Sequence, residues 1–145
     1  MYLADILCDK IALYNENEEY IYPVEEKLMY GNETIWVWWA LGLNAIFSAA
    51  STFSVEMHGK DKVSLKSNND KYLTVTTDGE VVFNASEIGK TEIFFVKSTA
   101  HEEVELMSIY EKYLSLKPND TIKFDAPIPG ASERWKAKCV EDDGM

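Results

Sequence analysis

Val63-Ser-Leu-Lys-Ser-Asn-Asn-Asp-Lys-Tyr-Leu-Thr-Val75 is the stretch that decides the fold, because its pattern occurs twice more in the chain. In this stretch an aromatic residue, Tyr72, follows nine positions after the apolar residue Val63. The same spacing joins an apolar residue to a Tyr in two other copies, at Ile11 and Tyr20 and at Val104 and Tyr113. Internal repeats of this kind determine the architecture, so they are interpreted before any other feature.

The first copy is longer than the second. Val63 lies 41 residues before Val104, whereas Ile11 lies 52 residues before Val63. The difference predicts about eleven extra residues in the first copy. We expect these residues between a third strand near 28–30 and a fourth strand at 53–55.

Each copy has the pattern of four short strands. In the second copy, alternation over 63–66 and β-forming residues over 72–75 predict two strands. Asp78-Gly79 is typical of a hairpin turn, and apolar runs at 81–83 and 93–96 complete the set. The sequence therefore predicts an all-β fold, a β-trefoil in which three four-stranded repeats build a closed six-stranded barrel with three hairpins. We expect one domain over 1–145, with repeats of about 10–57, 62–98 and 103–140 and a hydrophobic insert of about 33–48 in the first repeat.

Composition and charge narrow the possible functions. Hydrophobic residues at 46% and charged residues at 27% are typical of a globular protein. The 14 basic and 25 acidic residues give a net charge of −11, which repels nucleic-acid phosphates and anionic lipid. We therefore expect no nucleic-acid partner, and the charge disfavours a membrane. Two Cys residues and no secretory-signal pattern at Met1 favour a cytoplasmic location.

A family resemblance covers most of the chain. Phe53-Ser-Val-Glu-Met-His-Gly-Lys-Asp-Lys-Val-Ser-Leu-Lys-Ser67, continuing into Lys71-Tyr72-Leu73, resembles the repeat junctions of hisactophilin and fascin. Asp78-Gly-Glu-Val-Val-Phe-Asn-Ala-Ser-Glu-Ile-Gly89 is similar to the middle repeat of the facioscapulohumeral-dystrophy region family, which shares the trefoil superfamily. The resemblance implies a fascin-like trefoil of the actin-crosslinking superfamily, with an actin-associated or scaffolding role.

Three departures limit what the resemblance implies. Hisactophilin is rich in loop histidines, whereas this chain has only His58 and His101, so pH sensing is not carried over. The lysine-rich character of the dystrophy-region family is missing, so its nucleic-acid association is not carried over either. The chain contains no Gln, and this counts against ricin-type sugar-binding trefoils with their Gln-x-Trp element.

Residues 35–50 depart from the family pattern. Ile35-Trp-Val-Trp-Trp-Ala-Leu-Gly-Leu-Asn-Ala-Ile-Phe-Ser-Ala-Ala50 holds three of the four Trp residues and is shorter than the roughly 20 residues of a membrane-spanning helix. Three readings stay open: the insert covers one end of its own barrel, binds a partner or a second copy, or dips into a membrane. Acidic residues before the insert disfavour the membrane. Because Trp is frequent in binding hot spots, the candidate partner-binding residues are Trp36, Trp38, Trp39, Leu43, Ile46 and Phe47.

A second candidate contact lies at the junction into the second repeat, where four lysines occur within twelve residues: Lys60, Lys62, Lys66 and Lys71. Because actin is acidic, a basic patch here would suit an actin filament. Asp61 and Asp70 interrupt the group, and solvated lysines in turns and on a strand face are the alternative reading.

The repeat register brings the two cysteines together. Cys8 corresponds to Lys60 and Cys139 to Met57, and these two positions flank one tight turn. We therefore predict Cα atoms within about 10 Å, against the roughly 7 Å limit of an unstrained disulfide. In a reducing compartment two free thiols are expected.

Catalytic and metal-binding motifs are missing from the sequence. It has no Gly-x-Ser-x-Gly elbow, no His-Glu-x-x-His pair and no Gly-rich phosphate loop, and its His and Cys residues lack zinc-ligand spacing. We expect no enzyme, no cofactor and no metal. The predicted function is a protein-binding module associated with actin or the cytoskeleton. The alternative is self-association, as a homodimer, or partner docking through the Trp-rich insert without actin; a carbohydrate-binding trefoil is third.

Overall fold

Short antiparallel strands make up almost all of the regular structure in the computed structural model, which describes residues 8–48, 51–68, 70–100, 103–118 and 121–140. The strands are β1 (Lys10–Tyr14), β2 (Tyr20–Tyr30), β3 (Glu33–Asn44), β4 (Phe53–Met57), β5 (Lys62–Lys66), β6 (Tyr72–Val75), β7 (Val81–Ala85), β8 (Phe94–Ala100), β9 (Glu103–Met107), β10 (Tyr113–Leu116), β11 (Ile122–Ala126) and β12 (Trp135–Cys139). Two single 3₁₀ turns, η3 (Lys90–Glu92) and η4 (Ala131–Glu133), precede β8 and β12. These ranges contain no α-helix, as the alternating sequence pattern predicts.

Six strands close a barrel. Strand β1 pairs with β4, β4 with β5, β5 with β8, β8 with β9, β9 with β12, and β12 returns to β1. Closure leaves none of these six strands as the edge of an open sheet, which removes a template for aggregation. The predicted all-β fold with a closed six-stranded barrel is confirmed, and it fits a fascin-like β-trefoil.

The remaining six strands form three hairpins, β2–β3, β6–β7 and β10–β11. Each hairpin is joined to a barrel strand through a Tyr, because Tyr14 pairs with Tyr20, Lys66 with Tyr72 and Met107 with Tyr113. The three Tyr residues of the sequence pattern therefore occupy the same place in the pairing scheme.

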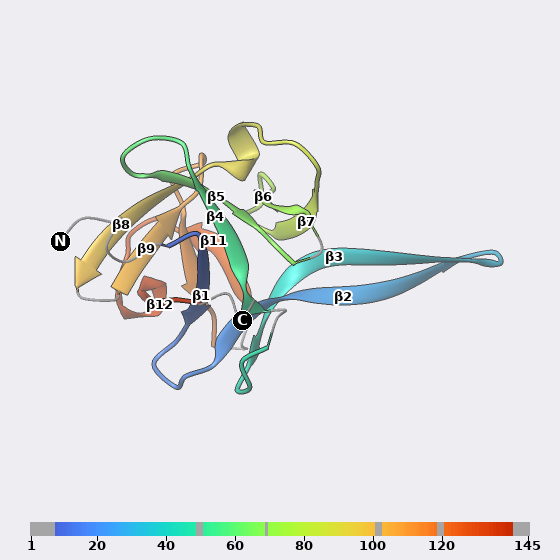
Figure 1. The fold of residues 1–145 in the computed structure, drawn as a ribbon, viewed down its shortest axis with the longest axis horizontal. Coiled ribbons are helices and arrows are strands. Elements are labelled where there is room, and N and C mark those ends of the chain that lie inside the picture. The colour runs from blue at the N-terminus through green and yellow to red at the C-terminus, as the bar shows by residue number, and fades with distance from the viewer. Residues whose placement is uncertain (1–7, 49–50, 69, 101–102, 119–120, 141–145) are drawn as a thin grey trace.

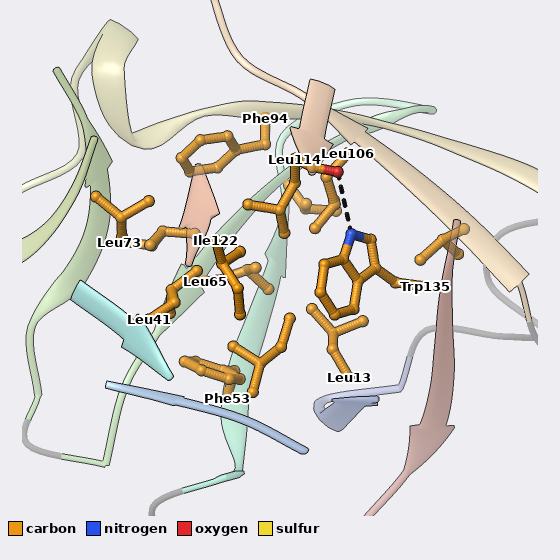
Figure 2. Close-up of a cluster of buried hydrophobic side chains, with 14 of the residues drawn as sticks. Leu13, Leu41, Phe53, Leu65, Leu73, Phe94, Leu106, Leu114, Ile122 and Trp135 are labelled. Carbon is orange, nitrogen blue, oxygen red and sulfur yellow. Dashed lines mark hydrogen bonds between the residues drawn. The ribbon is translucent and has the colours of Figure 1, made fainter. Parts of the chain in front are cut away.

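The core fills the barrel with side chains from all its strands (Figure 2). Phe53 stacks on Phe83 with ring centroids 6.0 Å apart, and Phe94 stacks on Phe124 at 4.9 Å. The indole Nε1 of Trp135 donates a hydrogen bond of 3.1 Å to the carbonyl of Leu114, which satisfies the polar atom of a buried ring (Figure 2). Each fully buried side chain of this size contributes about 1.5–3 kcal/mol.

A buried carboxylate closes the turn before β12. The amide of Gly130 donates to Glu133 Oε1 at 2.7 Å, and the hydroxyl of Ser115 donates to Oε2 at 2.6 Å. The turn before β8 uses the same Gly-x-x-Glu spacing, in which Gly89 donates to Glu92 at 2.8 Å. The sequence analysis did not recognise these carboxylates, although the repeated Gly-x-x-Glu-x-aromatic spacing is visible.

Ser51 takes the place of that carboxylate in the first copy. Its amide donates to the carbonyl of Ser48 at 3.0 Å, just as the amides of Glu92 and Glu133 donate to Gly89 and Gly130. The Ser51 hydroxyl is fully buried and has no hydrogen-bond partner among the residues that the structure describes. A buried polar atom without a partner costs about 1–3 kcal/mol, so this turn is the weakest of the three.

The β2–β3 hairpin corrects one expectation. Residues 28–30, predicted as a third strand, belong to the far end of β2, and the third strand is β3. Residues 33–44 of the predicted insert pair with β2 along their whole length, in a long arm that projects from the barrel (Figure 1). The copy lengths counted the extra residues without placing them, and a β-forming run on each side of Gly31-Asn32 favours one long hairpin.

The two cysteines form a disulfide. Cys8 and Cys139 are bonded with Cα atoms 5.5 Å apart, so the predicted distance below about 10 Å is confirmed. The expected pair of free thiols is wrong in this structure. Antiparallel pairing of β1 with β12 sets Ile11 opposite Cys139 and brings the sulfur atoms within bonding reach.

Candidate functional site

The four candidate lysines do not form one patch. Lys66 lies 3.7 Å from Asp70 and 5.5 Å above the ring of Tyr72. Lys71 donates a hydrogen bond of 2.9 Å to the hydroxyl of Ser86. These contacts engage two of the four cations within the protein, so Lys60 and Lys62, both exposed, are the better candidates for a partner.

An open groove lies beside Lys62. It has a volume of about 370 Å³, and its walls come from the turn after β4, the loop that leads into β8, β8 itself and the turn after β9. The apolar lining is contributed by Ile88, Ile93, Phe95 and Ile109. Segments far apart in the sequence therefore meet around one apolar concavity.

Cations flank this groove. His58, Lys62 and Lys90 line it, and Lys62 Nζ lies 5.6 Å from the centre of the Phe95 ring. The imidazole Nε2 of His58 shares a hydrogen bond of 2.9 Å with the hydroxyl of Ser64, which fixes the ring against β5. The groove is thus locally basic on a chain whose net charge is −11.

The buried carboxylate of Glu92 does not cancel this charge pattern by presenting free oxygens. Its Oε1 accepts from Gly89 at 2.8 Å, and its Oε2 accepts from Thr91 at 2.6 Å. Both oxygens are therefore occupied within the turn, and the cations remain available to an anionic ligand group.

Two larger grooves have a different character. One, of about 410 Å³ between the hairpins, contains Lys123 and Glu80, which form an ion pair of 3.5 Å. The other, of about 460 Å³, contains Asp61 and Glu105 beside Lys97. Because each larger groove brings its own carboxylates, the groove beside Lys62 is the better match for an acidic partner with apolar side chains.

The predicted insert residues are distributed along β3 and the segment after it. Trp36 pairs with Lys27 and Trp38 with Glu25, and Trp39 stands at the register shift that follows. The side chains of the three Trp residues lie outside the part of the structure that is described, so the prediction that they bind a partner stays a prediction.

The other three candidates of the insert have different environments. Leu43 is partly buried and packs against the core. Ile46 is 73% exposed. Phe47 is 40% exposed, but its ring lies 5.3 Å from the ring of Tyr20 and 5.1 Å from Lys138 Nζ. The structure therefore separates a core residue, an exposed residue and a member of an aromatic cluster.

Family comparison agrees with the pairing scheme. The sequence model of the fascin domain matches residues 40–137, which include strands β4 to β12 and the end of β3. The chain belongs to the fascin-domain family. The resemblance predicted from residues 53–73 is thereby confirmed, and most of the β2–β3 arm lies before the matched segment. A comparison with curated proteins found no match.

Metal and membrane features were also examined in this fascin-domain protein. The described residues contain no group of three or more His, Cys, Asp or Glu side chains placed to hold a metal ion. They include no helix that is long and apolar enough to cross a bilayer. His101, one of the two histidines of the sequence, lies outside the described residues.

Sequence reasoning missed most of the groove. Lys62 belonged to the predicted lysine group, but Lys90, Ile88 and Ile109 had no local pattern to mark them. They come from loops in different copies, and only the barrel closure brings them together. The repeat register offered one usable signal, since it places the turn after β4 next to the start of β8.

Proposed function

We propose that this fascin-domain protein is a non-catalytic protein-binding module that associates with actin filaments. The proposal includes a trefoil of three repeats, about 10–57, 62–98 and 103–140, with added residues in the first. The observation that carries it is the fascin-domain match over residues 40–137. The threefold recurrence of the Tyr-anchored hairpins supports the repeat assignment.

The groove between Lys62 and Lys90 is the surface that we assign to the filament. Its apolar lining suits side chains such as Ile or Leu, and its cations suit the carboxylates of an acidic protein. Lys60 extends the basic side of this surface on the exposed turn before β5. The contacts of Lys66 and Lys71 within the protein give these two a smaller part.

Co-sedimentation with actin filaments tests the proposal. The wild-type chain is expected to pellet with filaments, and less of it at higher salt, because salt screens exposed charge pairs. Reversing both groove charges, Lys62→Glu with Lys90→Glu, is expected to weaken binding about tenfold, from roughly 0.7 kcal/mol per exposed pair.

A matched control is Lys123→Glu, since Lys123 has a similar charge and lies on β11 in a different groove. This variant is expected to pellet like the wild type. If the wild-type chain stays in the supernatant at both low and moderate salt, actin association is refuted. Equal loss in the groove variant and the control would refute the assignment of the groove.

The disulfide sets a condition on this proposal. Actin filaments belong to the cytoplasm, where thiols are kept reduced, whereas disulfides persist in oxidising compartments. A cytoplasmic location therefore requires Cys8 and Cys139 to be reduced in the cell, and both residues are exposed to reductants. Alkylation of the protein in its native source decides between the two locations. Free thiols support the cytoplasmic proposal, and a stable disulfide contradicts it.

A further inference from the structure

The β2–β3 arm carries two strand edges of different character. Strand β2 pairs with β3 and, at its base, with β1, while β3 pairs only with β2 among the described strands. The edge of β3 that faces away from β2 therefore has backbone groups without a strand partner. The base of β3 packs against β7 and β11, so the accessible length is the outer part of the arm, about residues 34–40 (Figure 1).

Residue types protect one edge of the arm and leave the other unprotected. Strand β2 contains Pro23 and the consecutive charged residues Glu25, Glu26 and Lys27, which are typical of edges that avoid further pairing. Strand β3 has no charged residue and no Pro after Glu33. Its outer part is Thr-Ile-Trp-Val-Trp-Trp-Ala, rich in the β-branched and aromatic residues that favour pairing.

We propose that the free edge of β3 pairs with the same edge of a second copy, in an antiparallel homodimer with a continuous four-stranded sheet. A second copy fits because it supplies an edge of equal length, and an antiparallel pair of identical strands has twofold symmetry. With the axis at Val37, Thr34 lies opposite Ala40 of the second copy and Trp36 lies opposite Trp38. No charged residue meets another across this pairing.

The paired length is adequate for a specific contact. Seven residues of strand span about 23 Å, at roughly 3.3 Å per residue. The two barrels project from opposite ends of the shared sheet, because the arm extends away from its barrel (Figure 1). Each copy has a net charge of −11, so the dimer is expected to strengthen as salt is added. This salt dependence is opposite to the one expected for actin binding.

Cysteine crosslinking provides the direct test. In the proposed dimer the two Val37 residues face each other, with Cα atoms about 4.5–5.5 Å apart, a separation that a disulfide spans. Mild oxidation of the full-length Val37→Cys variant is therefore expected to give a covalent dimer. The control is Lys27→Cys on β2, whose two copies lie three strand spacings apart, about 14 Å, and are expected to remain uncrosslinked.

Sedimentation velocity supplies a second, non-covalent readout. The wild-type chain is expected to sediment as a dimer of 16.5 kDa subunits at micromolar concentration. Val37→Lys places two positive charges opposite each other on the axis and is expected to raise the dimer dissociation constant at least tenfold. Val37→Thr keeps a β-branched residue and is expected to remain dimeric. Unchanged thermal unfolding of the Lys variant shows that the barrel is intact.

Several results would overturn this inference. They are a wild-type monomer with no crosslinking of Val37→Cys, a Val37→Lys variant that stays dimeric, or a monomer that floats with neutral phosphatidylcholine vesicles, which would assign the arm to lipid. The inference does not depend on actin binding. Val37→Lys is expected to pellet with filaments like a monomeric module, while the Lys62 and Lys90 variants keep the dimer, so each proposal fails separately.

Discussion

Reduction of the Cys8–Cys139 bond is expected to destabilise the barrel strongly. The two residues are 131 positions apart, so the bond closes almost the whole chain into one loop. The chain-entropy relation gives about 5 kcal/mol for a loop of this length at 25 °C, and measured losses for native disulfides are typically about 2–5 kcal/mol. At roughly 2–4 °C per kcal/mol, the midpoint of thermal unfolding should fall by about 10 °C.

The reduced protein is nevertheless expected to fold. The β1–β12 ladder continues beside the bond, with Ile11 opposite Cys139 and the amide of Val140 donating to the Lys10 carbonyl at 3.0 Å. Calorimetry and urea unfolding, each with and without reductant, measure the effect on the wild-type chain. The double variant Cys8→Ser with Cys139→Ser is the control, because its stability should match that of the reduced wild type and ignore reductant.

A specific result would refute this reasoning. If oxidised and reduced wild-type chains unfold within 2 °C of each other (roughly 1 kcal/mol or less), the bond does not restrict the unfolded chain as the loop length requires. If reductant lowers the midpoint of the double Ser variant as much as that of the wild type, the effect comes from another source. The slope of the urea transition shows whether the change lies in the unfolded state, since reduction should leave the native barrel unaltered.

Three further predictions concern single side chains, each measured by urea unfolding. Ser51→Ala removes a buried hydroxyl without a partner among the described residues and should leave stability unchanged or raise it by about 1 kcal/mol; a loss above 1 kcal/mol would show that the hydroxyl is bonded. Glu133→Ala removes the acceptor of two hydrogen bonds and should cost about 2–3 kcal/mol, and no loss would contradict its role in the turn. Gly79→Ala places a Cβ against the Phe124 carbonyl at φ +83° and should cost more than 2 kcal/mol, whereas Gly31→Ala, at φ +63° with open space, should cost about 1 kcal/mol; equal losses would contradict the close approach.

The repeat pattern predicted the barrel because each copy repeats the same burial requirement. Val63 and Val104 are both buried, and each pairs with the buried aromatic residue that the spacing indicated, Phe94 and Trp135. The distance between the two cysteines followed from the same register. The oxidation state did not, because sequence spacing reports proximity and not the surrounding redox potential.

Other features depend on contacts that a linear pattern does not contain. The gain of about eleven residues was counted correctly, but its place in the β2–β3 hairpin depended on pairing between 24–30 and 33–40. The lysine group was predicted as one surface, whereas Asp70 and Ser86 engage two of its members. The groove required loops from separate copies to meet, and only the closed barrel brings them together.

The neighbouring positions of β1 and β12 have a consequence for protein engineering. Because the first and last barrel strands are hydrogen-bonded partners, a short linker from residue 139 to residue 8 would give a circular chain without moving any strand. New ends opened at Gly31, on the exposed tip of the arm, would then leave all six barrel strands covalently continuous. The same geometry means that domains fused before β1 and after β12 would emerge side by side, which suits a module carried in tandem.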